Sequence, residues 1–175
     1  MKRHPALVLV LCTLGTGPFV HAGPTAGPED LLPFKQALMG ALQAGLAEGP
    51  VAAVTACNLI APGLPAAQAE RGFEVGRASD RLRNPHNTAP AWVAPVLDGM
   101  LAGTRPIEGR AVWLDDGRTG WVEPIRIGPM CLQCHGDAID EEVAAALDAR
   151  YPEDRARGYA AGDLRGVFWI VPTER

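Results

Sequence analysis

The chain lacks an excess of positive charge and a second close pair of cysteines. Its 20 Asp and Glu residues outnumber its 16 Lys and Arg residues, and the formal net charge is −4. This balance argues against a nucleic-acid partner, which would require a basic patch. No internal repeat is visible, and the expected elements show no regular strand–helix alternation, which favours an α+β fold with an antiparallel sheet.

The first 22 residues have the pattern of a secretory signal peptide. Lys2 and Arg3 supply a positive start, and residues 6–14 form an apolar segment too short to span a membrane. Val20-His21-Ala22 resembles a cleavage site with small residues at its two key positions. We therefore expect cleavage near Ala22, a periplasmic location, and one mature domain over residues 23–175 with no stable membrane insertion.

Two cysteines two residues apart, followed at once by histidine, form the attachment motif of c-type haem. The motif here is Cys131-Leu132-Gln133-Cys134-His135. Each thiol can add across one haem vinyl group to form a thioether, and the two-residue gap matches the separation of the vinyl groups. His135 would then lie beneath the iron and donate a ring nitrogen as the proximal axial ligand. The motif predicts one covalent haem c per chain, bound through Cys131 and Cys134.

Two other interpretations use the same residues. A zinc site could combine Cys131 and Cys134 with Cys57 and either His86 or His135, although structural zinc sites usually have a second close pair of ligands. A dithiol redox pair also uses the Cys-x-x-Cys spacing, but it is expected at a helix start near a βαβ unit. Here the pair follows an expected hairpin late in the chain, which favours haem.

Apolar periodicity predicts two helices near the start of the mature chain. The first covers about 31–47, and its apolar face is expected to pack into the core. Residues at helical spacing form this face: Leu31, Phe34, Leu38, Leu42 and Leu46. A second helix over 51–60 would begin at Pro50 and present Cys57 from an apolar side.

The second half of the chain predicts an antiparallel sheet and therefore an α+β fold. Strands over 109–115 and 119–127 flank the turn sequence Asp115-Asp116-Gly117, and the second strand leads into Cys131. Trp113 and Trp121 are expected to face each other across this pair. A helix over 138–149 and a last strand over 164–171 follow. In an earlier short helix that starts near Thr88, Pro95 is expected to cause a kink or an early end.

The stretch from Gly76 to Asn87 is polar and rich in turn-forming residues, so it is interpreted as a loop. Its arginines, Arg77, Arg81 and Arg83, could either be solvated or line the haem site and pair with the two haem propionates.

The sixth position of the iron has several candidate ligands: Cys57, His86, Met39, Met100 and Met130. An isolated methionine on a helix is more often core packing, and His86 lies in the polar loop. Cys57 is the sharper candidate, because ligation would explain a lone cysteine in an oxidising compartment. The alternative is a buried, inert thiol.

Several segments together resemble a family of single-haem, c-type, PAS-like proteins of the bacterial periplasm and cyanobacterial lumen. The matching pieces are Ala56-Cys57, Ala61-Pro62, Gly76-Arg77 through Arg81, Arg83-Asn84-Pro85, Asn87, Cys131 to Gly136, Tyr151-Pro152, Gly158-Tyr159 and Gly162-Asp163-Leu164-Arg165-Gly166. The resemblance implies a PAS-like antiparallel sheet flanked by helices, after N-terminal helices. It also implies His135 and Cys57 as the axial pair. The chain departs from the family's pattern at Ala94-Pro95, and it has Ala78 and Asp80 within the arginine segment.

These observations predict a periplasmic monohaem c-type cytochrome that senses redox state or a small gas ligand. A small electron carrier is the alternative, and a zinc-binding structural module is the non-haem alternative. A redox or signalling protein is the expected partner, since the chain carries no transmitter domain. Enzymatic activity is not expected: a peroxidase would need an acid–base group over an open iron site, and His86 would be its one candidate.

Overall fold

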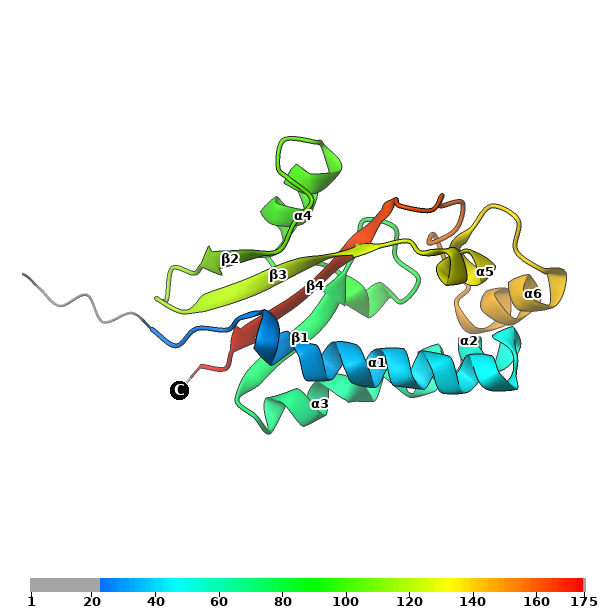
Figure 1. Cartoon of the computed structure of the whole chain (residues 1–175), viewed down its shortest axis with the longest axis horizontal. Helices are drawn as coiled ribbons and strands as arrows, with labels where there is room; N and C mark the ends of the chain where they lie inside the picture. Colours follow the sequence, from blue (N-terminus) through cyan, green and yellow to red (C-terminus); the bar gives the residue numbers. More distant parts are fainter. Residues whose placement is uncertain (1–22, 175) are drawn as a thin grey trace, which may run out of the picture.

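The computed structural model describes residues 23–174, so the predicted signal peptide over 1–22 lies outside the described residues. Figure 1 shows a twisted sheet with helices on both sides and a group of helices beyond one end. The helical elements are α1 (Pro28–Glu48), α2 (Pro50–Leu59), η1 (Ala61–Gly63), α3 (Leu64–Ala69), η2 (Pro85–Asn87), α4 (Ala94–Leu101), η3 (Pro129–Cys131), α5 (Leu132–His135) and α6 (Glu141–Arg150). The strands are β1 (Phe73–Ala78), β2 (Arg110–Trp113), β3 (Thr119–Arg126) and β4 (Leu164–Pro172).

Local chemistry sets the boundaries of the N-terminal helices. The carboxylate of Asp30 accepts a hydrogen bond from the backbone N–H of Gly27 at 3.0 Å, and Pro28 occupies the first turn of α1. Gly49 separates α1 from α2 with φ of 121°, a backbone conformation that favours glycine. Residues 50–69 then form one helical stretch that meets the length and composition of a membrane span. In this fold, α2 packs on α1 and α6, and α3 packs on β1.

The four strands form one antiparallel sheet in the order β1-β4-β3-β2. The turn between β2 and β3 uses Gly117 at φ of 85°. The register of β2 with β3 pairs Trp113 with Thr119 and Ala111 with Trp121. The expectation that the two tryptophans face each other is therefore wrong. Trp113 is 81% exposed on an edge strand, whereas Trp121 packs against the core.

Both faces of the sheet are covered. On one face, α4 packs with strand residues in a closed apolar cluster made of Ala78, Val93, Val96, Leu97, Met100, Val122 and Val167. On the other face, Leu31 and Phe34 of α1 pack with Val75 and Ile170. The short helix α4 begins at Ala94 and not near Thr88 as expected. Pro95 lies in its first turn and not at a kink or an early end, which corrects the expectation for this residue.

The predicted class, an α+β fold with an antiparallel sheet flanked by helices and preceded by N-terminal helices, is confirmed. Beyond one end of the sheet, α2 packs against α5 and α6. The apolar contacts there join Val54 of α2 to Val143 and Leu147 of α6. This helical end holds the candidate site.

Candidate functional site

A cavity of about 260 Å³ lies between α1, α2, α5 and the sheet. Six of the seven predicted site residues line it: Cys57, Cys131, Cys134, His135, Arg77 and Arg83. Arg81 is the exception, because its guanidinium stacks on the ring of Tyr159 at 4.0 Å. The fold therefore brings residues from four separate parts of the chain to one place.

One wall of the cavity comes from the apolar stripe of α1. Leu38, Leu42 and Leu46 line the cavity, whereas the stripe was expected to pack into the core along its whole length. Leu31 and Phe34, at the other end of the stripe, are buried in protein as predicted. One side of α1 therefore serves both the core and the cavity.

The Cys131–His135 segment leaves the end of β3 through a 3₁₀ turn and one turn of helix. Residues three apart in such a turn lie on one side, which presents Cys131 and Cys134 together. The backbone N–H of Gly128 donates to Cys131 Sγ at 3.4 Å, and the N–H of Gly136 donates to the Leu132 carbonyl at 2.9 Å. Both cysteines are free thiols. The segment is compact and offers its sulfur atoms to the cavity.

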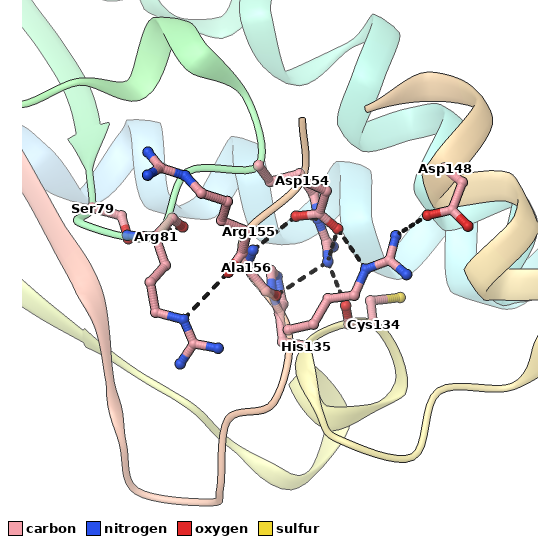
Figure 2. A network of polar contacts seen from close by, with 10 residues as sticks. Ser79, Arg81, Cys134, His135, Asp148, Asp154, Arg155 and Ala156 are labelled. Carbon is pink, nitrogen blue, oxygen red and sulfur yellow. Dashed lines mark hydrogen bonds and ion pairs between the residues drawn. The ribbon is translucent and has the colours of Figure 1, made fainter. Parts of the chain in front are cut away.

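His135 is held in one tautomer. Its Nδ1–H donates to the backbone carbonyl of Ala156 at 2.7 Å, which leaves Nε2 as the free ring nitrogen (Figure 2). Burial, followed by the charges of Arg83 and Arg165, lowers the pKa of the imidazole to about 3. The ring is therefore neutral at physiological pH, the form in which imidazole can donate a lone pair to a metal.

Arg83 connects the cysteine segment to the rest of the fold. Its guanidinium pairs with Asp154 at 3.1 Å and donates to the carbonyls of Cys134 and Ala156. Burial opposes ionisation of Asp154, but hydrogen bonds from Arg83 and Arg157 outweigh it and hold the pKa of the carboxyl below its usual value. Asp154 and Ala156 were not anticipated from the sequence, because only the folded chain places the segment 154–157 under α5.

Cys57 reaches the same cavity from α2. Burial raises the pKa of its thiol, and the positive charges of Arg77 and Arg83 oppose that effect. Arg77 itself belongs to β1 and not to the predicted loop. Arg77 therefore supplies a positive charge that favours the thiolate form of Cys57.

The cavity is also lined by three cations that the sequence analysis did not single out, namely Lys35, Arg126 and Arg165. Lys35 is paired with Glu123. Arg165 donates from Nη1 to Ser79 Oγ at 2.6 Å, but its buried Nε finds no hydrogen-bond acceptor among the described residues. The pairing of β1 with β4 brings Arg165 toward Ser79, and this register is not visible in the sequence.

The other candidate iron ligands are distributed unevenly. His86 is exposed in η2 and does not line the cavity, and Met100 is buried under the opposite face of the sheet. Met39 and Met130 line the cavity, with exposures of 45% and 38%. Within residues 23–174, no three His, Cys, Asp or Glu side chains come together as a site for a metal ion, so the geometry does not favour the zinc alternative.

Comparison with known proteins places this chain in a family. A model of the Tll0287-like family, described as Tll0287, matches residues 35–172. The chain belongs to the Tll0287-like family. Its fold is similar to the crystal structure of the cyanobacterial haem protein Tll0287, with a TM-score of 0.60 and 21% identity over 86% of this chain and 98% of that one. A search of curated proteins finds no match.

Proposed function

We propose that this member of the Tll0287-like family is a periplasmic monohaem c-type cytochrome. Cys131 and Cys134 would hold one haem through thioether bonds, and His135 would be its proximal ligand. The observation that carries the proposal is the convergence of the attachment motif, Cys57 and several cations on one apolar-walled cavity. The relation to a haem protein of the same fold supports it.

The residues present fit a haem group. His135 has its Nδ1 engaged by Ala156 and its Nε2 free, as an axial ligand requires. Leu38, Leu42 and Leu46 offer an apolar wall to a flat macrocycle. When bound, the haem would supply an iron that takes up and releases a single electron.

The cations of the cavity suit the two haem propionates. Arg77 and Arg165 line the cavity, and neither forms an ion pair with a carboxylate of the described residues. The unpartnered Nε of Arg165 is a buried donor that an anionic oxygen would satisfy. We propose Arg77 and Arg165 as the main propionate contacts. Arg81 and Arg83, which were also predicted to make such contacts, are already engaged by Tyr159 and Asp154.

We propose that Cys57 is the second axial ligand and that the protein senses redox state or a small gas molecule. Arg77 and Arg83 would stabilise the anionic thiolate that such ligation requires. An anionic ligand favours ferric iron, so Cys57 would hold the oxidised state and bind more weakly after reduction. We further propose that the sheet is PAS-like, that the chain is not an enzyme, and that it passes its signal to a separate protein.

Electron transfer is the second candidate function. Met39 and Met130 expose apolar surface where they border the cavity, which would suit brief contact with another redox protein. This function predicts fixed ligation and fast reversible reduction, whereas a sensor predicts a labile sixth ligand.

Optical and EPR spectra of the protein, produced with haem-c maturation machinery, test the ligand assignment. Wild type is compared with Cys57→Ala and with the control Met39→Leu. We expect a low-spin ferric signature that changes in Cys57→Ala and stays the same in Met39→Leu. Identical spectra for wild type and Cys57→Ala would overturn the assignment of Cys57, and a change in Met39→Leu alone would assign the sixth ligand to Met39.

A further inference from the structure

Arg83 and Asp154 form a buried ion pair next to the backbone carbonyl that accepts the hydrogen bond of His135. The side chains of Arg83 and Asp154 are only 11% and 2% exposed. Arg83 Nε donates to Asp154 Oδ1 at 3.2 Å, and its Nη2 lies 3.1 Å from Oδ2. A buried pair of this kind needs further hydrogen bonds to offset its desolvation, and Arg83 finds them on two backbone carbonyls.

One of these carbonyls, that of Ala156, is shared with the candidate axial ligand. It accepts from His135 Nδ1 at 2.7 Å and from Arg83 Nη2 at 3.3 Å. The other carbonyl belongs to Cys134, within the attachment motif. Arg83 is therefore hydrogen-bonded both to the cysteine segment and to the carbonyl that accepts the hydrogen bond of the imidazole.

Ala156 is also held in place without Arg83. Its backbone N–H donates to Asp154 Oδ1 at 2.9 Å, and Arg157 Nε donates to Asp154 Oδ2 at 2.9 Å. Without the Arg83 contact, the Ala156 carbonyl would stay in position but would no longer accept a hydrogen bond from a cation. The remaining hydrogen bond from His135 would then become stronger.

The strength of that hydrogen bond matters to a metal-bound imidazole. A stronger acceptor at Nδ1–H makes the ring a more electron-donating ligand. A more electron-donating ligand stabilises ferric iron and lowers the reduction potential. A cation on the same acceptor has the opposite effect.

We propose that Arg83, anchored by Asp154, is a positioning residue for His135 that acts through the shared Ala156 carbonyl and raises the reduction potential of the bound haem. This inference rests on the proposed haem function. It assigns to Arg83 a task separate from contact with the propionates, and it explains why Arg83 has three protein acceptors.

The test compares full-length haem-loaded wild type with Arg83→Lys, which keeps the charge but lacks the planar fork of donors. The matched control is Arg157→Lys, because Arg157 also pairs with Asp154 but has no bond to Ala156 or Cys134. We expect Arg83→Lys to shift the reduction equilibrium roughly tenfold toward ferric iron, about 59 mV for a one-electron couple. The His135 Nδ1–H proton should move downfield in NMR spectra, and Arg157→Lys should change neither quantity.

The proposal would be overturned if wild type and Arg83→Lys had the same reduction potential and the same Nδ1–H proton shift. It would also be overturned if Arg83→Lys and Arg157→Lys changed these two quantities equally. If Arg83→Lys does not take up haem, the Nδ1–H proton is measured in the haem-free wild type and variant. The same downfield movement is expected there, and its absence would contradict the proposal. Wild type that takes up no haem would contradict the proposed function instead. The haem-free proton shifts would still decide whether Arg83 acts on the Ala156 carbonyl.

Discussion

The two ends of α1 carry the same apolar stripe but meet different surroundings. Near the sheet, Phe34 packs edge-on against Phe168, with ring centroids 6.1 Å apart, and protein covers it completely. Further along, Leu42 and Leu46 face the cavity. Helical periodicity therefore identifies the face of α1 that is withdrawn from water, but it does not show whether protein or a bound group covers that face.

Charge separates the two ends in the same way. At the end of α1 near the sheet, Phe34 belongs to a cluster of apolar side chains. The cavity gathers Arg77, Arg83 and Arg165, whose burial is costly without anionic partners or hydrogen bonds. Protein groups supply only part of that compensation, since Arg165 Nε has no acceptor among the described residues. This deficit supports the proposal that an anionic group, such as a haem propionate, binds there.

The largest effect on stability is expected at the end of α1 that packs against the sheet. Phe34→Ala should lower the free energy of unfolding by about 3–5 kcal/mol, because it opens a cavity in a packed core. Denaturant unfolding of protein with and without haem should give similar losses, and Phe34→Leu should cost less. A loss confined to the haem-loaded protein would show that Phe34 belongs to the cofactor site.

The buried ion pair should come next. Asp154→Asn should lower stability by about 3 kcal/mol at pH 7, because it leaves Arg83 buried beside a neutral group. The pKa of Asp154 is lowered in the folded state, so its contribution is complete above the unfolded pKa of about 3.9 and is lost as pH falls through the folded value. The difference from wild type should therefore shrink below about pH 4.

Unfolding followed over a pH series measures this dependence. Asp148→Asn is the control, because Asp148 pairs with Arg157 at an exposed position and should contribute less than about 0.5 kcal/mol. A pH-independent difference for Asp154→Asn would contradict the role of the carboxylate charge.

At the end of α1 that faces the cavity, a smaller effect on stability is expected in the haem-free protein. Leu42→Ala should cost about 1 kcal/mol there, because Leu42 faces the cavity and has fewer protein neighbours to lose. The loss should grow when haem is bound, and paired denaturation curves would measure the increase. If Leu42→Ala is as costly as Phe34→Ala without haem, the two ends of the stripe are alike and the comparison fails.

The smallest effect is expected at the edge of the sheet. Trp113→Ala should change stability by no more than about 0.5 kcal/mol, because the side chain is exposed. Trp121→Ala is the matched control and should cost clearly more, since Trp121 packs against the cluster around Phe34. Equal losses in thermal or denaturant unfolding would indicate that the tryptophans pack together after all.

Local patterns predicted much of this fold. The hairpin, the helix that carries Cys57 and the attachment segment each depend on residues close together in sequence, and each was found near its predicted place. Pro95 was misjudged because a proline suits the first turn of a helix as well as it disrupts the middle. The pairing of Trp113 and Trp121 failed because it depended on the strand register.

The candidate site was only partly predictable for the same reason. Cys131, Cys134 and His135 form one contiguous motif, so the sequence alone could predict that they lie together, and their role in haem attachment stays a prediction. Arg165 is brought to the site by the register of β1 with β4. Asp154 is brought there by the segment that returns beneath α5. These contacts join residues more than 70 positions apart, beyond the reach of any local pattern.

Mass spectrometry under denaturing conditions tests the central claim most directly. The protein would be produced with haem-c maturation machinery, as wild type and with both Cys131 and Cys134 changed to alanine. Wild type should have the mass of a chain that begins at Gly23 with one haem attached, and the double variant should have no attached haem. Wild type with no haem, or with haem that separates on denaturation, would contradict the account.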